Sequence, residues 1–431
     1  MLRLLIKSPM MSRPKVIVIA GTTGVGKSDL SIQIASKFNG EIINSDSMQM
    51  YTGIPIITNK HPIEQRMGIK HHLMNHVPWN EEYYIHRFER ECMETIEDIH
   101  SRGKIPIVVG GTHYYLQTLF NKRVESKVRQ PTESEKSILD SNNPDLIYNT
   151  LKEVDLSIAN KFHINDTRRV KRMLEIYYTT GEKPSVTFQQ QNTSLKFDTL
   201  FFWIYSDPAV LDVRLDNRVD KMMKIGAMEE IMELYEYYKQ HNYGQEQCEN
   251  GVWQVIGFKE FLPWLEESSE CDLNECVEKM KVRTRQYAKR QVKWIRKMLI
   301  PDVDGKVYIL NATDLLEWDV SVSARANAIL SDFTKGKDIE APLAQPDLEK
   351  LLAYKSSNSP KSDMDWKQFS CSLCKDKEDK NLVAIGSRNW EIHLKSRRHK
   401  TNINRQHKKK SYEKWQKKKL LEMDSSSINS H

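Results

Sequence analysis

A chain of 431 residues is too long for one hydrophobic core, which rarely grows past about 250–300 residues, so two or three domains are expected. Its hydrophobic fraction of 39% and charged fraction of 29%, without any long apolar run, describe a soluble globular protein and exclude a membrane span and wholesale disorder. Residues 361–431 carry 18 Lys and Arg against 9 Asp and Glu, whereas residues 1–360 carry 47 against 49. The positive excess therefore lies in the C-terminal part and predicts a polyanionic partner there.

The first 13 residues resemble a mitochondrial transit peptide. Positions 3, 7 and 13 are Arg or Lys, no acid precedes Asp29, and the residues at 2, 4, 5 and 6 supply an apolar face. A frayed basic N-terminus is the alternative, because the segment is short and poor in serine. Translation from Met11 would remove the segment, so we expect the protein in both the cytoplasm and the mitochondrion.

Alternating strand-like and helix-like stretches predict an α/β parallel-sheet core, formed by residues 14–121 and 199–310. The run KVIVIAG from residue 15 is short, β-branched and continuously apolar, which is typical of a buried parallel strand, and residues 28–38 after it have helical spacing. Further strands are predicted at 41–47, 104–111 and 200–206, with helices near 86–101 and 113–121.

Three later stretches depart from this alternation of strands and helices. Residues 122–198 are polar and contain one amphipathic helix, RRVKRMLEIYYTTG, which ends at Gly181, so they are predicted to form a helical insertion domain. Residues 281–300 predict a basic helix with eight Lys or Arg and no acid, which is either a solvated face or a nucleic-acid contact. Residues 311–365 lose strong patterning and are predicted to be a linker.

The segment GTTGVGKS at residues 21–28 satisfies the P-loop pattern G-x-x-x-x-G-K-[ST] between a predicted strand and a predicted helix. Glycines let the backbone curl so that successive N–H groups face one phosphate cluster, and the helix N-terminus adds its dipole. Lys27 would neutralise phosphate oxygens, and Ser28 would help to hold Mg²⁺. The residues predicted to bind a diphosphate are Gly21, Thr22, Thr23, Gly24, Val25, Gly26, Lys27 and Ser28.

This P-loop lacks a feature of nucleotide-hydrolysing proteins. Those proteins usually place an acid at the end of an apolar strand to hold the metal, but the strand at 104–111 ends in Gly110-Gly111-Thr112. The strand that delivers an acid is EIINSDS, which puts Asp46 at the edge of the sheet where ligands bind. Asp46 is a metal ligand, a general base or a helix cap on this reasoning alone.

Cys371, Cys374, His393 and His399 have the spacing of a tetrahedral zinc site, C-x2-C followed after 18 residues by H-x5-H. The long gap differs from the DNA-reading finger, in which about 12 residues separate the pairs, and resembles the matrin or U1-like finger of RNA-associated proteins. We expect a zinc finger over 366–405 and a basic tail over 406–431. The lysine runs of this tail are a nuclear address, RNA contacts or a solvated surface.

Seven segments in fixed order resemble the tRNA dimethylallyltransferase (tRNA isopentenyltransferase) family: GTTGVGKS, INSDSMQ, VVGGTHYYLQ, RRVKRMLEIY, RLDNRVDKM, NGVWQVIGFKE and TRQYAKRQVKW. They cover about residues 14–300, and the added zinc finger is similar to that of eukaryotic, fungal-type members. The resemblance implies transfer of a dimethylallyl group from dimethylallyl diphosphate to N6 of adenosine 37, beside the anticodon, in tRNAs that read codons beginning with U. It also implies that the P-loop and Mg²⁺ hold the donor's diphosphate, which accounts for the missing strand-end acid.

The resemblance assigns roles to residues by motif position. Asp46 would accept the N6 proton, and the other catalytic residues would be Thr23, Lys27, Thr112 and Arg218. Asp46 and Gln49 would hold the flipped base, and Ser47 and Met48 would complete this tRNA-contacting stretch. Further tRNA contacts are expected from Arg168, Arg169, Val170, Lys171 and Arg172 in the insertion, and from Gln286, Lys289 and Arg290 on the basic helix.

Two other functions stay open on the sequence alone. One is a P-loop kinase that phosphorylates a nucleotide or small metabolite, and the other is a non-catalytic zinc-finger RNA-binding protein with a vestigial P-loop. The absence of a sustained heptad pattern argues against a coiled coil, and we expect a monomer. The expected partners are the tRNA anticodon stem-loop and dimethylallyl diphosphate, with no membrane.

Overall fold

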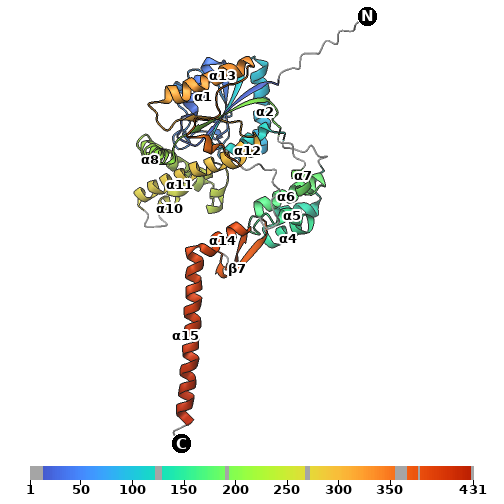
Figure 1. Ribbon diagram of the computed structural model, residues 1–431, viewed down its shortest axis with the longest axis vertical. Helices are drawn as coiled ribbons and strands as arrows, with labels where there is room; N and C mark the ends of the chain where they lie inside the picture. The colour runs from blue at the N-terminus through green and yellow to red at the C-terminus, as the bar shows by residue number, and fades with distance from the viewer. Residues whose placement is uncertain are drawn as a thin grey trace. The chain divides into compact units, whose positions relative to one another are not determined.

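The computed structural model describes residues 13–121, 129–189, 194–266, 272–354, 366–376 and 379–428 (Figure 1). The chain divides into two compact units, the first formed by residues 1–122 and 192–356 and the second by residues 123–191 and 357–431. The helical insertion and the Cys/His segment, predicted as separate domains, therefore belong to one unit. The predicted targeting segment at 1–13 lies, except for Arg13, outside the described residues.

Six parallel strands form the sheet of the first unit in the order β3-β2-β4-β1-β5-β6. Their bounds are β1 Lys15–Gly21, β2 Gly40–Asn44, β3 His71–His72, β4 Ile105–Val109, β5 Asp198–Tyr205 and β6 Tyr308–Asn311. β1 pairs with β4 on one side and β5 on the other, so that Ile17 lies opposite Ile107 and Leu200. The predicted parallel α/β sheet is confirmed, whereas β3 and β6 are too short to leave a periodic signal in the sequence.

Helices cover both faces of this sheet. Alternate residues of β1 enter two apolar clusters, Val16 and Val18 on one face and Ile17 and Ile19 on the other. Helix α2 (Ile85–Ser101) packs on the first face, and α1 (Lys27–Lys37) and α13 (Arg325–Lys335) pack on the second (Figure 1). Burial on both faces explains why the strands are continuously apolar rather than alternating.

The other helices of the first unit pack beside this sheet. They are α8 Pro208–Lys224, α9 Ala227–Gln240, α10 Phe258–Leu265, α11 Leu273–Trp294 and α12 Ile300–Asp302. Short helical turns occur at η1 Met48–Met50, η2 Ile63–Gln65, η3 His113–Leu119, η4 Gln245–Glu249, η5 Gly251–Gln254, η6 Ile295–Leu299, η7 Asp319–Ala324 and η8 Glu349–Leu351. Helix α11 contains most of the predicted basic helix and packs against α8 and α10.

The predicted linker over 311–365 is wrong for residues 311–354. Strand β6 ends at Asn311 within the sheet, and α13 buries Ala326, Ile329 and Leu330 completely in the second apolar cluster. The apolar residues of α13 have helical spacing, but they are few, and some of them are small. The proline-containing segment PLAQPDLEK follows this helix and favoured the prediction of an irregular chain. Residues 355–365 lie outside the described residues.

The second unit combines a helical bundle with a small Cys/His fold. The bundle contains α3 Glu133–Asp140, α4 Pro144–Val154, α5 Leu156–Ala159, α6 Thr167–Thr180 and α7 Pro184–Gln189, around a core that includes Ile147, Leu151 and Leu174. The Cys/His fold contains the antiparallel strands β7 Gln368–Lys375 and β8 Asn381–Ile385, then α14 Ser387–Lys395 and α15 Arg397–Ile428. The predicted basic tail thus continues α15 instead of forming a separate segment.

Gln368 joins the two parts of this unit. Its Nε2 donates to Tyr148 Oη at 2.7 Å and to the Phe162 carbonyl at 3.1 Å. The ammonium of Lys161 lies 5.4 Å from the centre of the Trp366 ring. Within the described residues, no helix is both long and apolar enough to cross a membrane.

A buried ion cluster fixes the N-terminal end of β2. Glu41 is 3% exposed and accepts hydrogen bonds from Arg102, from Lys104 at 2.8 Å and from His72 at 2.7 Å. The hydrogen bond from Arg102 contributes most to holding the pKa of Glu41 well below its ordinary value. The carboxylate form is therefore the one that stabilises the folded state.

Replacing Glu41 with Gln is expected to lower the free energy of unfolding by about 2 kcal/mol at pH 7. This is below the usual cost of breaking a buried ion pair because Arg102 and Lys104 remain partly solvated. Since the folded pKa is depressed, the stabilisation is present above the ordinary pKa of 4.5 and is lost as the pH falls below it. Urea unfolding at pH 7 and pH 3.5 measures both effects, and the exposed control Glu236→Gln should change neither. Equal losses at the two pH values would contradict the account.

Candidate functional site

The P-loop, Gly21–Ser28, connects β1 to α1 at the C-terminal edge of the sheet. Gly24 and Gly26 have φ values of 80° and 84°, in the left-handed region that favours glycine. A Cβ on Gly24 would lie 2.7 Å from Leu215, and one on Gly26 would lie 2.6 Å from the Trp318 ring. Backbone conformation and space therefore both require glycine at these two positions of the loop.

Lys27 begins α1 and turns back over the P-loop. Its Nζ donates to the Thr22 carbonyl at 2.7 Å. Burial lowers the pKa of Lys27 to about 8, Asp46 opposes this, and Arg218 lowers the pKa further. Thr22 and Val25 are buried at 3% and 1% exposure, so they contribute backbone groups rather than side chains to any ligand.

Helix α8 brings Arg218 to the same loop. Its Nη1 donates to Thr23 Oγ1 at 2.7 Å, and its Nε is buried without a hydrogen-bond partner among the described residues. Burial lowers the pKa of Arg218 to about 10. Burying a guanidinium with an unpaired N–H costs free energy unless an anion accepts a hydrogen bond from that N–H. Because the Thr23 hydroxyl accepts from Arg218, its hydrogen is left to donate to the same anion.

Asp46 follows β2 at the edge of the sheet where the P-loop lies. Its Oδ1 accepts from the Met48 N–H at 3.1 Å, so the residue before the N-cap Ser47 bonds to the first residue of η1. Burial raises the pKa of Asp46, and Lys27 opposes this rise. A carboxylate with a raised pKa is a stronger base than an ordinary aspartate. The hydrogen bond to Met48 and the role of a base are therefore compatible in one side chain.

The loop after β4 is tied to the loop after β2. Thr112 Oγ1 accepts from the Ser47 N–H at 3.0 Å and donates to Ser47 Oγ at 3.1 Å. The Thr112 N–H donates to the Ser45 carbonyl at 3.1 Å. These bonds fix the position of Asp46, which lies between Ser45 and Ser47.

Several of these groups line a cavity of about 270 Å³, whereas Lys27 and Thr112, which are also predicted to be catalytic, do not line it. Thr23, Asp46, Arg218 and Tyr287 give it polar walls, and its apolar walls include Met48, Ile57, Met222, Val255 and Met280. The predicted residues Ser47 and Arg290 also line it. Gln49 does not line it, because its Nε2 donates instead to the carbonyls of Thr58 and Asn59 at 3.1 and 3.0 Å.

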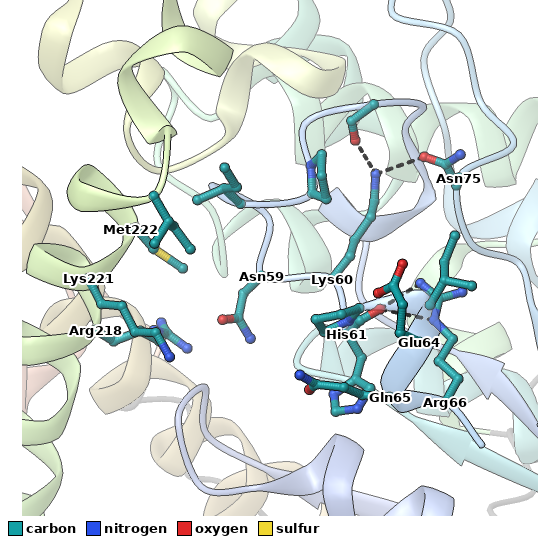
Figure 2. A pocket seen from close by; sticks show the side chains of 16 residues that line it. Asn59, Lys60, His61, Glu64, Gln65, Arg66, Asn75, Arg218, Lys221 and Met222 are labelled. Carbon is teal, nitrogen blue, oxygen red and sulfur yellow. Dashed lines mark hydrogen bonds between the residues drawn. The ribbon is translucent and has the colours of Figure 1, made fainter.

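A larger cavity of about 810 Å³ adjoins the first and shares Asn59, Arg218 and Met222 with it. Figure 2 shows Arg218 and Met222 of α8 on one side of this cavity and Asn59 and Lys60 on the other. Lys60 donates to the carbonyls of Tyr51 and Gly53 and to Asn75 Oδ1 at 3.1 Å, and burial lowers its pKa to about 8. These bonds hold the segment 51–60, which contributes lining residues to both cavities.

The other predicted tRNA contacts lie outside these cavities. Gln286 and Lys289 are exposed on α11, and Lys289 pairs with Asp212 at 3.1 Å. In the second unit, the exposed cations of α6 are Arg168, Arg169 and Arg172, with Lys171 half-buried. Arg169 pairs with Asp166 and Arg172 with Glu175.

Val170, predicted to bind tRNA, has a fully buried side chain. It lies in the apolar core of the helical bundle, on the face of α6 that also carries Met173 and Leu174, so its side chain packs against the protein. The spacing of these three apolar residues in the sequence is the signal that could have predicted this burial.

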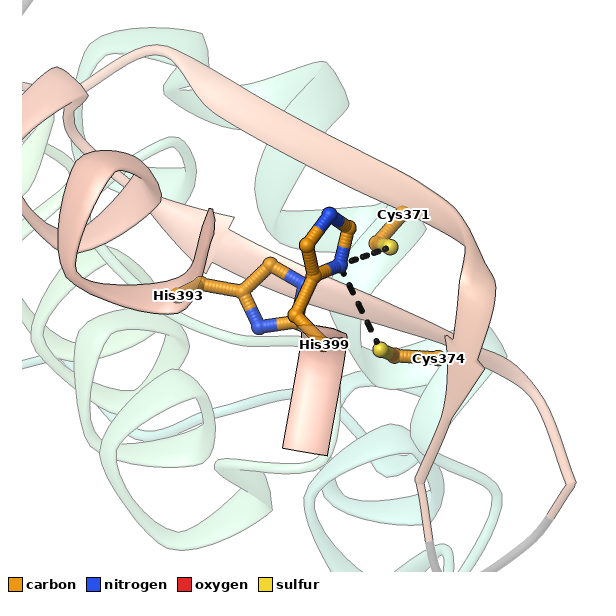
Figure 3. Close-up of side chains that lie close together, drawn as sticks. All are labelled: Cys371, Cys374, His393 and His399. Atoms are coloured by element: carbon orange, nitrogen blue, oxygen red, sulfur yellow. Dashed lines mark hydrogen bonds between the residues drawn. The ribbon is translucent and has the colours of Figure 1, made fainter. Parts of the chain in front are cut away.

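Four predicted ligands meet in the second unit. Cys371 and Cys374 come from β7, His393 from α14 and His399 from α15, and their ligand atoms all lie within 4.8 Å of one another. Figure 3 shows the two sulfurs facing His399, whose Nδ1 lies 3.5 Å from Cys371 Sγ and 3.6 Å from Cys374 Sγ. The buried Nε2 of His393 has no hydrogen-bond partner among the described residues. The cluster can therefore hold a metal ion.

Sequence reasoning missed two buried polar residues behind the cavity. His113 Nε2 lies 3.2 Å from the Gly21 nitrogen, and burial lowers the pKa of His113 to about 3, so its ring is neutral. Gln291 contacts Thr23 and Gly111. Both residues lie inside the quoted motifs, and a polar residue on the apolar face of a helix was the available signal for Gln291.

Comparison with known proteins identifies close relatives. The family model described as IPP transferase matches residues 49–298. The tRNA dimethylallyltransferase of Saccharomyces cerevisiae is 61% identical over 406 residues, covering 93% of this chain and 95% of that protein. The human tRNA dimethylallyltransferase is 33% identical over 413 residues, covering 89% of this chain and 85% of that protein.

Solved structures agree with these sequence matches. The structure of a eukaryotic dimethylallyltransferase acting on tRNA is 61% identical and superposes with a TM-score of 0.86, covering 94% of this chain and all of that chain. The full-length tRNA isopentenylpyrophosphate transferase of Bacillus halodurans is 28% identical with a TM-score of 0.54, covering 75% of this chain and 98% of that chain.

Proposed function

Because the chain belongs to the IPP transferase family, we propose that it transfers a dimethylallyl group from dimethylallyl diphosphate to N6 of adenosine 37 in tRNAs that read codons beginning with U. The products are N6-(dimethylallyl)adenosine and diphosphate. The observation that carries the proposal is one cavity in which Arg218, with an unpaired buried N–H, faces the Asp46 carboxylate beside the P-loop. Such a cavity combines an anion site with a base.

The donor's diphosphate would lie against the P-loop. Lys27 and Arg218 supply positive charge, and the Thr23 hydroxyl supplies a hydrogen-bond donor. The electron pair of the breaking C1–O bond passes to the diphosphate, so these groups stabilise the charge that develops there. Ser28, on the first turn of α1, would hold a Mg²⁺ ion through its hydroxyl, which is a hard oxygen ligand, and the ion would supply positive charge against the diphosphate.

The adenine would enter from the apolar side of the cavity. Its exocyclic amine is a poor nucleophile because the lone pair is delocalised into the ring, so the amine must lose a proton as its nitrogen bonds to C1 of the donor. Asp46 accepts that proton. Burial raises the pKa of Tyr287, so its phenol stays protonated beside the reacting groups. An adenine stacked in the anticodon loop must first flip out to reach this depth, at a cost of a few kcal/mol.

The kinase alternative has less support. A kinase needs a metal-holding acid near its P-loop, but β4 is followed by Gly110-Gly111-Thr112, and much of the cavity wall is apolar. Incubating the full chain with tRNA and either dimethylallyl diphosphate or ATP separates the possibilities. We expect tRNA-dependent release of diphosphate from the prenyl donor and no ADP. ADP formation without prenyl transfer would favour the kinase.

The Cys/His cluster fits zinc. A zinc ion about 2.3 Å from each sulfur and about 2.0–2.1 Å from each nitrogen, in tetrahedral geometry, separates sulfur from nitrogen by about 3.6 Å. The two sulfur-to-nitrogen distances at His399 are 3.5 and 3.6 Å. We assign the metal a structural role, because the four protein ligands would fill all positions of a tetrahedron.

Replacing Cys374 with Ser should release zinc and weaken tRNA binding by about 10-fold or more, with a shallower salt dependence, because the finger then loses its fold. The single-turnover rate at saturating tRNA should change less than about threefold. Metal analysis, filter binding and rapid quench measure the three quantities. His407→Asn, at an exposed position of α15, is the matched control. A collapse of the chemical rate in the Cys374 variant would show that the finger takes part in the reaction centre.

We place the protein in the cytoplasm and mitochondrion, with a nuclear fraction, and propose that it is monomeric. The basic, acid-free segment 1–13 supports mitochondrial import, and the lysine runs at 408–410 and 417–419 support nuclear entry. Imaging a fusion that starts at Met11 tests the first point, because mitochondrial signal that persists would contradict it.

A further inference from the structure

Gln291 connects the donor side of the cavity to the acceptor side. Its side chain is 3% exposed, on the face of α11 that also buries Thr284 and Ala288. Its Oε1 accepts from the Thr23 N–H at 2.9 Å, and its Nε2 donates to the Gly111 carbonyl at 2.9 Å. One amide thus satisfies one buried donor and one buried acceptor from two different loops.

The glycine at position 111 leaves room for the Gln291 amide. A Cβ on Gly111 would lie 2.5 Å from Gln291 Nε2 and 3.0 Å from Asp46 Oδ2, so any larger residue would displace one of the two side chains. Tyr287, one turn earlier on α11, donates to the same Gly111 carbonyl at 3.3 Å. Helix α11 therefore holds the loop after β4 through two side chains and the P-loop through one.

The hydrogen bond from the Thr23 N–H to Gln291 also determines which groups of Thr23 can bind a ligand. The Thr23 N–H is committed to Gln291, and its hydroxyl accepts from Arg218. The hydroxyl hydrogen is then the Thr23 group left to donate to the diphosphate. On the other side, Gly111 precedes Thr112, which bonds to Ser47 next to Asp46.

We propose that Gln291 is a positioning residue that sets the separation between the Thr23 hydroxyl, which contacts the leaving diphosphate, and the Asp46 base. The inference rests on the proposed transfer reaction. Gln291 contacts neither substrate; it acts through Thr23 and through the Gly111–Thr112 loop. Moving either loop by about 1 Å would take the reacting atoms out of line, which is known to cost about 10²-fold in rate.

Two variants of Gln291 test this role. Gln291→Leu has a similar volume and removes both hydrogen bonds. Gln291→Glu keeps an acceptor for the Thr23 N–H but sets a carboxylate against the Gly111 carbonyl and Asp46. We expect each variant to lower the single-turnover rate by about 10²-fold, with affinities for dimethylallyl diphosphate and the anticodon stem-loop within about threefold of wild type. The control Gln117→Leu removes a half-buried glutamine whose amide bonds to Asp302, and it should react at the wild-type rate.

Wild-type rates in both variants would overturn the proposal. A loss confined to tRNA affinity would also overturn it, because Gln291 would then be an RNA contact. If thermal melting shows that Gln291→Leu is unfolded at the assay temperature, the rate of the Glu variant alone decides. Failure of the wild-type protein to transfer the prenyl group would contradict the proposed function itself, and this inference with it.

Discussion

Replacing Asp46 with Asn is expected to slow single-turnover prenyl transfer by about 10²–10⁴-fold, the usual contribution of a general base. The amide oxygen of Asn can still accept from the Met48 N–H, so the turn after β2 is retained while the proton acceptor is lost. Affinities for the donor and the anticodon stem-loop should change little. Rapid-quench assays at saturating substrates, with separate binding measurements, check both parts.

The pH dependence gives this prediction a second readout. The reactive form of Asp46 is the carboxylate, and burial raises its pKa, so the wild-type rate should fall as the pH drops through that raised value. The Asp46→Asn variant should lose this limb of the profile. Asp198→Asn, at a partly exposed position at the start of β5, is the control and should keep both the rate and the profile. An unchanged rate in the Asp46→Asn variant would remove Asp46 from the chemistry and leave the family assignment intact.

Replacing Arg218 with Gln should lower kcat/KM for dimethylallyl diphosphate by about 10²–10³-fold, which is the cost of removing one preorganised donor from developing negative charge. The variant loses the hydrogen bond to Thr23 Oγ1 and the buried N–H that would donate to an anion. Arg218→Lys should recover only part of the loss, since an ammonium lacks the planar fork that can bond Thr23 and a phosphate oxygen together. Inhibition by inorganic diphosphate reports the affinity of the site directly.

The comparison variant for Arg218 is Lys224→Gln, an exposed cation at the end of the same helix and outside both cavities. It removes the same formal charge and should change neither kcat/KM nor inhibition by diphosphate. If Arg218→Gln also left diphosphate inhibition unchanged, the leaving group would have to bind away from α8.

Local signals were enough to predict the parts of the site that depend on one segment of chain. The P-loop pattern is recognisable because its glycines and Lys27 lie within eight residues between a strand and a helix, and the Cys/His cluster because its spacing is typical of a metal site. Asp46 could be placed at the ligand-binding edge because it follows a short apolar strand. Its pattern alone leaves metal ligand, base and cap open, and the role of base stays a prediction that rests on the family resemblance.

Features that depend on contacts between distant segments were not predictable in this way. Gln291 lies 268 residues from Thr23 and 180 from Gly111, and nothing in its own helix shows which groups its amide will bond. Strand β6 was missed for a similar reason, since it is stabilised by pairing with β5 rather than by its own pattern. The joining of the Cys/His fold to the helical bundle through Gln368 likewise has no local signal.

The central claim is that the cavity between the P-loop and Asp46 joins a prenyl donor to a tRNA adenine. The most direct measurement is single-turnover transfer of labelled dimethylallyl diphosphate, with Mg²⁺, to two anticodon stem-loops that differ only in carrying A or G at position 37. We expect label on N6 of A37 and none on the G37 stem-loop. Absence of label on A37, with both ligands bound, would contradict the assignment of this cavity as a prenyl-transfer site.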